Sequence, residues 1–204
     1  MGFADEMRSP GSGCLGWMAR KIMAGGVKEH VDAVQGLLDV SESMTVVELG
    51  PGAGGALHEI LSKGCPKVYA IEISDVFRKG LEAQPVCAEA VKAGRLTISG
   101  DDAKSLAFIP SKSVDRILGI NVVYFLDPMA DYFKELHRIL KPGGMLLWTV
   151  KDMVKSMDQK VYVNTDWDLV LASLKAAGFE ASIGEARAGD GKKSGYFPLI
   201  AKKK

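Results

Sequence analysis

The chain has 204 residues, 47% of them hydrophobic, and 26 basic residues nearly balance 25 acidic ones for a net charge of +1. This composition suits a single domain and excludes a disordered chain. The balanced charge gives no reason to expect nucleic acid as a partner, and three scattered cysteines favour neither a disulfide framework nor a metal site. The sequence shows no signal peptide and no apolar run as long as a membrane span, so we expect a cytoplasmic protein without a membrane partner.

The residues before Thr45 lie outside the alternation of strands and helices that follows. Gly25 and Gly26 separate two segments with apolar residues at helical spacing. The domain boundaries that we expect are a flexible lead-in at residues 1–13 and one domain at residues 14–204, made of a helical lid at residues 14–44 and an α/β core at residues 45–204.

The run Val-Val-Glu-Leu-Gly-Pro-Gly-Ala-Gly-Gly at residues 46–55 is typical of a buried strand, a glycine-rich turn and the start of a helix. Its glycine spacing has two interpretations. From Gly50 to Gly55 it satisfies G-x-G-x-x-G, the dinucleotide-binding fingerprint. From Glu48 to Gly54 it satisfies E-x-G-x-G-x-G. The motif by itself therefore leaves the ligand open.

Further strands and helices alternate after this run, which predicts a parallel sheet with helices on both faces. The later strands are expected at residues 67–73, 95–99, 114–120, 145–150, 179–186 and 196–201, and the later helices at residues 76–93, 129–140 and 167–177. The last two strands are joined by a loop too short for a helical crossover, so we expect an antiparallel hairpin. Glu72, at the end of the second strand, is placed to accept hydrogen bonds from ribose hydroxyls.

Four stretches together resemble the class I S-adenosylmethionine (SAM) methyltransferases, especially the type 11 methyltransferase domain. They are residues 46–55, 70–74, 100–108 and 136–148. The resemblance implies a Rossmann-like, doubly wound seven-stranded sheet in the order 3-2-1-4-5-7-6 with the last strand antiparallel. It also implies SAM as cofactor, S-adenosylhomocysteine as product, and methyl transfer to a nitrogen or oxygen of a small-molecule acceptor. We expect a monomer or homodimer.

The resemblance also implies cofactor-binding residues. Glu48 would brace the glycine turn and help hold the methionine end of SAM, and Glu72 would bind the ribose. One of two neighbouring carboxylates, Asp101 or Asp102, would bind the adenine amine. The other expected cofactor contacts are Gly50, Gly52, Gly54, Ile73, Ala103 and Asn121.

Asn121 and Tyr124 keep the N-x-x-Y spacing of the N-P-P-Y motif of amine-methylating enzymes, although both prolines are absent here. In that motif the asparagine accepts a hydrogen bond from the target amine and the aromatic ring stacks on the substrate. The alternative is that Tyr124 belongs to the core. His30 is the candidate general base. We expect residues 14–30 and 151–166 to close over the methyl group, with Gly25 and Gly26 as hinge.

Two other functions fit parts of the pattern. One is a SAM-binding module without catalysis. The other is an NAD-dependent short-chain oxidoreductase, which needs a tyrosine with a lysine four residues later. None of the five tyrosines has one.

Overall fold

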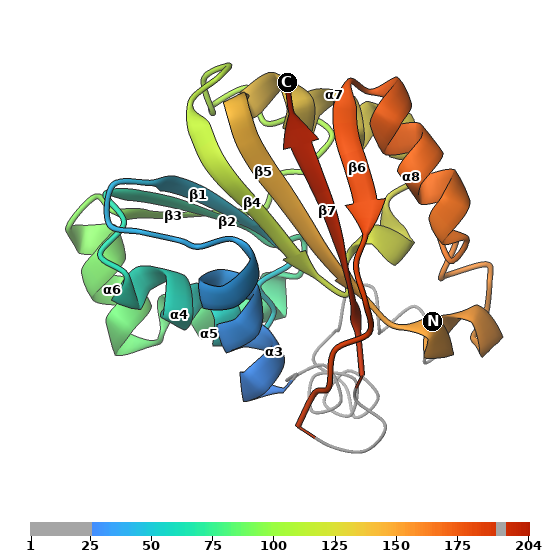
Figure 1. Cartoon of the computed structure of the whole chain (residues 1–204). Helices are drawn as coiled ribbons and strands as arrows, with labels where there is room; N and C mark the ends of the chain where they lie inside the picture. Colours follow the sequence, from blue (N-terminus) through green and yellow to red (C-terminus); the bar gives the residue numbers. More distant parts are fainter. Residues whose placement is uncertain (1–25, 191–194) are drawn as a thin grey trace.

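The computed structural model describes residues 26–190 and 195–204. The lead-in, the first lid helix and Gly25 therefore lie outside the described residues. Within them, seven strands form one sheet in the order β3-β2-β1-β4-β5-β7-β6, which confirms the expected order (Figure 1). The strands are β1 (Thr45–Leu49), β2 (Lys67–Ile71), β3 (Leu96–Ser99), β4 (Val114–Ile120), β5 (Leu140–Val150), β6 (Phe179–Ile183) and β7 (Phe197–Lys203).

Strand pairing brings the ends of three strands together at one edge of the sheet. β1 is parallel to both β2 and β4, so the segments that follow these three strands emerge side by side. β7 is antiparallel to both β5 and β6, which confirms the expected hairpin. The order of the sheet reverses at β1, where ligands bind in open α/β sheets.

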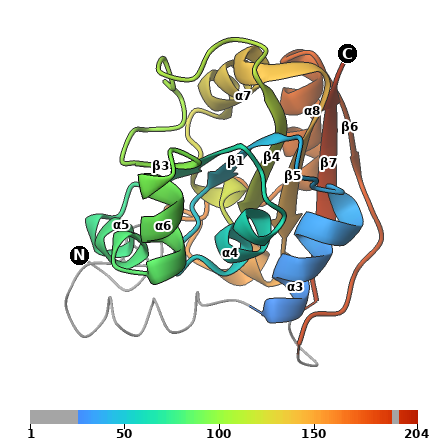
Figure 2. The same ribbon diagram turned by 90° about the vertical axis from the view of Figure 1, so that its left-hand side faces the viewer.

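Helices cover both faces of the sheet (Figure 2). They are α3 (Val27–Val31), the π-helical segment η1 (Asp32–Leu37), α4 (Gly55–Ser62), α5 (Asp75–Glu82), α6 (Pro85–Lys92), α7 (Met129–Ile139) and α8 (Trp167–Ala176), with short 3-10 turns η2 (Val123–Phe125) and η3 (Asp152–Ser156). Buried side chains of η1, α4, α5 and α6 form one core with the sheet, and those of α7 and α8 form the core on the opposite face.

The single helix expected at residues 76–93 is wrong, because the chain forms α5 and α6 instead. Proline disfavours helical backbone in the preceding residue, and Gln84 is extended at φ −80° and ψ 128°. Pro85 then occupies the first turn of α6, where its missing N–H costs nothing.

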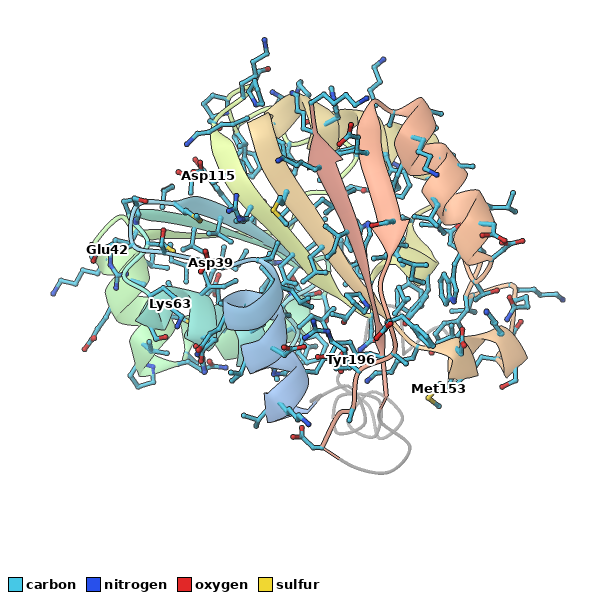
Figure 3. The ribbon with its side chains drawn as sticks, in the orientation of Figure 1. Asp39, Glu42, Lys63, Asp115, Met153 and Tyr196 are labelled. Atoms are coloured by element: carbon cyan, nitrogen blue, oxygen red, sulfur yellow. The ribbon has the colours of Figure 1, made fainter. Side chains whose placement is uncertain are left out.

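The described part of the expected lid packs into the core. Ala33 and Val34 of η1 are fully buried, in the same cluster as Val46 of β1. Arg187 forms an ion pair of 2.8 Å with Asp32. The hydroxyl of Tyr196, a residue labelled in Figure 3, also donates to Asp32. Residues 27–38 therefore belong to the layer of helices on the sheet. Of the expected N-terminal lid, only the residues before them remain candidates for this role.

Candidate active site

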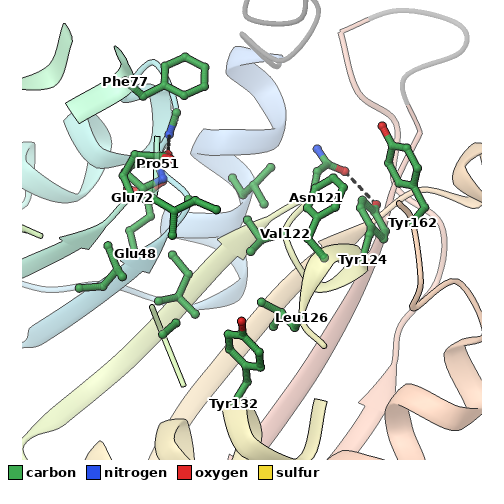
Figure 4. A pocket seen from close by; sticks show the side chains of 18 of the residues that line it. Glu48, Pro51, Glu72, Phe77, Asn121, Val122, Tyr124, Leu126, Tyr132 and Tyr162 are labelled. Carbon is green, nitrogen blue, oxygen red and sulfur yellow. Dashed lines mark hydrogen bonds between the residues drawn. The ribbon is translucent and has the colours of Figure 1, made fainter. Parts of the chain in front are cut away.

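A cavity of about 300 Å³ opens at the carboxyl ends of β1, β2 and β4 (Figure 4). Most residues that the sequence singled out meet there. Those that line it are His30, Glu48, Gly50, Gly52, Glu72, Ile73, Asp102, Ala103, Asn121 and Tyr124. Gly54 and Asp101 do not line it. Apart from Lys151, the remaining lining is apolar and aromatic, and includes Phe125, Met157 and Tyr162.

The glycine turn needs glycine for backbone reasons as well as for space. Gly50, Gly52 and Gly54 have φ values of 62°, 54° and 90°, in the left-handed region that other residues rarely adopt. A Cβ on Gly50 would lie 2.7 Å from Cγ2 of Val122. A Cβ on Gly52 would meet only the Phe77 ring, at 3.9 Å, so this residue leaves room in the cavity. Gly54 caps the N-terminus of α4 without a side chain.

Glu72 is buried beside this turn. Its Oε2 accepts a hydrogen bond from the N–H of Gly52 at 3.1 Å, and its Oε1 accepts one from the N–H of Ser74 at 2.8 Å. Burial raises the pKa of Glu72, although these hydrogen bonds and Arg78 oppose the change. The carboxyl group therefore joins the glycine turn to the end of β2 and still lines the cavity.

Glu48 lies at the floor of the same wall. Burial, with the neighbouring charge of Glu72, raises the pKa of Glu48 to about 8. Its Oε2 is buried and has no hydrogen-bond partner among the described residues. Buried polar atoms are nearly always paired, so an unpaired carboxyl oxygen that lines a cavity fits a ligand with a hydrogen-bond donor.

The two carboxylates after β3 have different surroundings. Asp101 is exposed, and its Oδ2 accepts a hydrogen bond from the hydroxyl of Ser99. Asp102 lines the cavity next to Ala103. Burial would raise the pKa of Asp102, but hydrogen bonds from the backbone of Lys104 and the hydroxyl of Tyr132 outweigh burial and lower it. Ile73, 46% exposed, adds an apolar surface to the same cavity.

A chain of hydrogen bonds runs through the opposite side of the cavity. The N–H of Lys151 donates to the hydroxyl of Tyr124 at 2.7 Å, and that hydroxyl donates to Oδ1 of Asn121 at 3.0 Å. Tyr124 is only 1% exposed and packs near Tyr162 and Trp167, with ring centroids 5.9 and 6.0 Å away. Burial raises the pKa of Tyr124 far above its ordinary value, so its hydroxyl stays protonated. This burial favours the interpretation of Tyr124 as a core residue.

A buried ion pair that the sequence did not predict holds Lys151, the first residue of this series of hydrogen bonds. Glu29 of α3 is 1% exposed; its Oε2 lies 3.0 Å from Nζ of Lys151, and its Oε1 accepts a hydrogen bond from Thr149 at 2.6 Å. The partners are more than 100 residues apart, so no local pattern could reveal the pair. The next residue, His30, lines the cavity and packs on Gly55 at the start of α4. Burial lowers the pKa of His30, and Lys151 acts in the same direction.

Neither a metal cluster nor a membrane-spanning helix is found in the described part of the chain. No group of three or more histidine, cysteine, aspartate or glutamate residues among residues 26–190 and 195–204 could hold a metal ion. None of the helices in these ranges is long and apolar enough to cross a membrane.

Comparison with known proteins identifies the class. A family model described as a methyltransferase domain of type 11 matches residues 47–148, half of the chain, and the chain belongs to this family. The protein is therefore a SAM-dependent methyltransferase with SAM as its cofactor, as the resemblance of its sequence motifs implied.

Individual relatives are more distant. A sterol 24-C-methyltransferase of Gibberella zeae is 27% identical over 182 residues, which cover 79% of this chain and 47% of that protein. The chain thus spans less than half the length of the curated relatives that it matches.

Solved structures share the fold. A SAM-dependent methyltransferase from Aquifex aeolicus has a TM-score of 0.66 at 21% identity, covering 90% of this chain and 96% of its own. A 1,6-didemethyltoxoflavin N1-methyltransferase from Burkholderia thailandensis, solved with bound 1,6-didemethyltoxoflavin and S-adenosylhomocysteine, has a TM-score of 0.64 at 18% identity, and the match covers 87% of this chain and 77% of that chain.

Proposed function

We propose that the protein transfers the methyl group of SAM to a nitrogen or oxygen atom of a small-molecule acceptor. The observation that carries this proposal is the division of the cavity into two walls. Glu48, Glu72 and Asp102 gather on one wall, and Phe125 and Tyr162 belong to the other. One cavity thus offers hydrogen-bond acceptors for a polar cofactor and an apolar surface for a second molecule.

The acidic wall fits the polar groups of SAM. Glu48, with its unpaired Oε2, would accept from the ammonium group, and Glu72 would accept from the ribose hydroxyls. Asp102, rather than the exposed Asp101, would accept from the adenine amine, while Ile73 and Ala103 would pack on the adenine ring. The role of Gly50, Gly52 and Gly54 is to let the turn approach the ligand closely.

SAM supplies a methyl group that a sulfonium already activates, so the task of the protein is mainly alignment. Asn121, at the end of β4, would position the acceptor beside that methyl group. Tyr124 would act through Asn121 as a positioning residue, because it is buried and bonded to it. His30 would take the proton of the acceptor, since its lowered pKa leaves the imidazole neutral near pH 7.

Residues 151–166 would shape the acceptor side of the cavity. Met153, Val154, Met157 and Tyr162 line it. The Nδ2 of Asn164 donates to the carbonyls of Val123 and Leu126 at 2.9 and 2.7 Å, which ties this segment to η2. We keep residues 14–26 as the second cover, hinged at Gly25 and Gly26.

The relatives support a small-molecule acceptor by analogy, since one is a sterol methyltransferase and another a 1,6-didemethyltoxoflavin methyltransferase. The net charge of +1 disfavours nucleic acid. We still expect the protein to be a monomer or homodimer and to be located in the cytoplasm. A SAM-binding module without catalysis is the alternative.

The test is a mass-shift screen. The protein is incubated with a metabolite extract and SAM that carries a trideuterated methyl group. We expect a small molecule to gain the labelled methyl only when active protein is present. Labelled nucleic acid would overturn the acceptor class. Binding of SAM by calorimetry, without any labelled product, would favour the silent module.

A further inference from the structure

The amide of Asn121 has a fixed orientation, because the hydrogen bonds that reach it run in one direction. A backbone N–H can only donate, so the hydroxyl of Tyr124 accepts from Lys151 at 2.7 Å. The hydroxyl hydrogen of this buried tyrosine then needs an acceptor, and Oδ1 of Asn121 lies 3.0 Å away. The oxygen of the Asn121 amide is therefore committed to Tyr124.

The nitrogen of the same amide stays available. In Figure 4 the Asn121 nitrogen lies on the side away from Tyr124. Asn121 lines the cavity, and no described residue accepts a hydrogen bond from its Nδ2. The backbone of Asn121 adopts φ 58°, a left-handed conformation that asparagine tolerates, and its N–H donates to the carbonyl of Thr149 at 3.0 Å. Backbone and side chain are both held, so the site presents a donor at this position.

A donor discriminates between nucleophiles. A neutral amine has a single lone pair, and an N–H group bonded to that lone pair would block the attack on the methyl group. An oxygen has a second lone pair, so it can accept a hydrogen bond from Nδ2 and still attack. The donor also stabilises the negative charge that an oxygen gains as its proton leaves.

The surroundings indicate the rest of the acceptor. Phe125 and Tyr162 lie 5.2 Å apart between ring centroids and both line the cavity, which suits a flat aromatic molecule. Lys151 lines it too, but Glu29 neutralises its charge. The carboxyl groups on the opposite wall disfavour an anionic acceptor.

We infer that the acceptor is a neutral aromatic alcohol, whose hydroxyl oxygen accepts a hydrogen bond from Nδ2 of Asn121. This inference rests on the proposed function and narrows its nitrogen-or-oxygen choice to oxygen. A lone pair of the oxygen forms the new O–C bond as the C–S bond breaks and its electron pair returns to sulfur. The hydroxyl proton goes to His30, so a methyl ether and a neutral thioether result.

The test compares matched probes: phenol with aniline, and 2-naphthol with 2-naphthylamine. All four are neutral at pH 7.5, and each pair differs only in the polar atom. The full-length protein is first titrated with S-adenosylhomocysteine by calorimetry, and the methylation of each probe is then measured with SAM. Failure to bind S-adenosylhomocysteine would count against the proposed function, whereas the probe ratios report on Asn121.

We expect each alcohol to be methylated faster than its amine, because an amine whose lone pair is bonded to Nδ2 cannot attack. Tyr124→Phe frees the amide to rotate, so the ratio of alcohol to amine methylation should fall about two- to tenfold, the value of one hydrogen bond. Tyr69→Phe removes a hydroxyl outside the cavity and should keep the wild-type ratio. Amines that are methylated as fast as alcohols, or a ratio that Tyr124→Phe leaves unchanged, would overturn the inference.

Discussion

Glu48, in β1, and Glu72, directly after the neighbouring strand β2, share one wall of the cavity, and the charge of Glu72 adds to burial in raising the pKa of Glu48 to about 8. The folded protein therefore holds a proton on Glu48 at neutral pH that the unfolded chain, with a pKa of 4.5, has lost. This difference has consequences for stability and for cofactor binding.

The first prediction concerns stability. At Glu48 the folded state binds more protons than the unfolded state between pH 4.5 and about 8, so the contribution of Glu48 to the free energy of unfolding of the ligand-free protein should decrease as pH rises through this range. Glu48→Gln mimics the protonated group and should remove this contribution, leaving that of Glu72, whose pKa is also raised, and the opposite one of His30 and His137, whose pKa values are lowered. Urea unfolding at a series of pH values measures it. A wild-type slope in the variant would show that Glu48 is ionised in the folded protein.

The second prediction concerns the proton itself. The ammonium group of SAM beside Glu48 should lower its pKa, so binding at pH 7 should release up to about one proton. Calorimetry in buffers of different ionisation enthalpy counts the released protons. Glu48→Gln should release none, because it has no proton to lose. Binding heats that do not depend on the buffer would mean that the ammonium group lies elsewhere.

The third prediction concerns Glu72. Glu72→Ala should weaken SAM binding about 10- to 150-fold, because hydrogen bonds to a charged group contribute roughly 1.5–3 kcal/mol. Glu82→Ala is the matched control, since Glu82 is exposed on α5 and outside the cavity. Thermal unfolding checks that both variants fold. Normal affinity in folded Glu72→Ala would exclude Glu72 as the ribose ligand.

The fourth prediction separates backbone strain from cavity space. Gly52 and Gly143 both have positive φ, 54° and 77°, and neither would meet a close atom as alanine. Each substitution should cost about 1–2 kcal/mol of stability from left-handed backbone strain. Only Gly52→Ala places a methyl group in the cavity, so it alone should weaken SAM binding, by about tenfold or more. Equal affinities of the two variants for SAM would argue against a close approach of SAM to the backbone at Gly52.

The fifth prediction concerns the buried pair of Glu29 and Lys151. Lys151→Met leaves a buried carboxylate unpaired and should lower the free energy of unfolding by roughly 3–5 kcal/mol. The exposed pair of Lys204 and Glu180 is the control, and Lys204→Met should change it by about 0–1 kcal/mol. The double variant Glu29→Leu with Lys151→Met should recover much of the loss. Similar effects of the two lysine substitutions would mean that Glu29 is solvated.

The sequence predicts the sheet well because hydrophobic runs and turn residues are local signals. The strand order came from the resemblance carried by four motifs, and the structure confirms it. The prediction of one helix at residues 76–93 was wrong. The helical spacing of apolar residues continues through Pro85, but this proline forces an extended backbone at Gln84 and ends the helix there.

Glu48, Glu72 and Asp102 belong to short motifs, so the sequence alone could single them out. The wall opposite them depends on contacts between distant segments, such as Phe125 with Tyr162 and Glu29 with Lys151. No spacing rule encodes these contacts. The N-x-x-Y pattern did locate Asn121 and Tyr124, but the direction of the hydrogen bond between them required the position of Lys151.

The most direct test of the account is a crystal structure of the protein with S-adenosylhomocysteine. We expect the adenine amine on Asp102 with the ring against Ile73, the ribose hydroxyls on Glu72 and the ammonium group on Glu48. The sulfur should then face Asn121 across the cavity. A ligand bound in the reverse direction, with adenine against Asn121, or bound outside this cavity, would contradict the assignment of both walls.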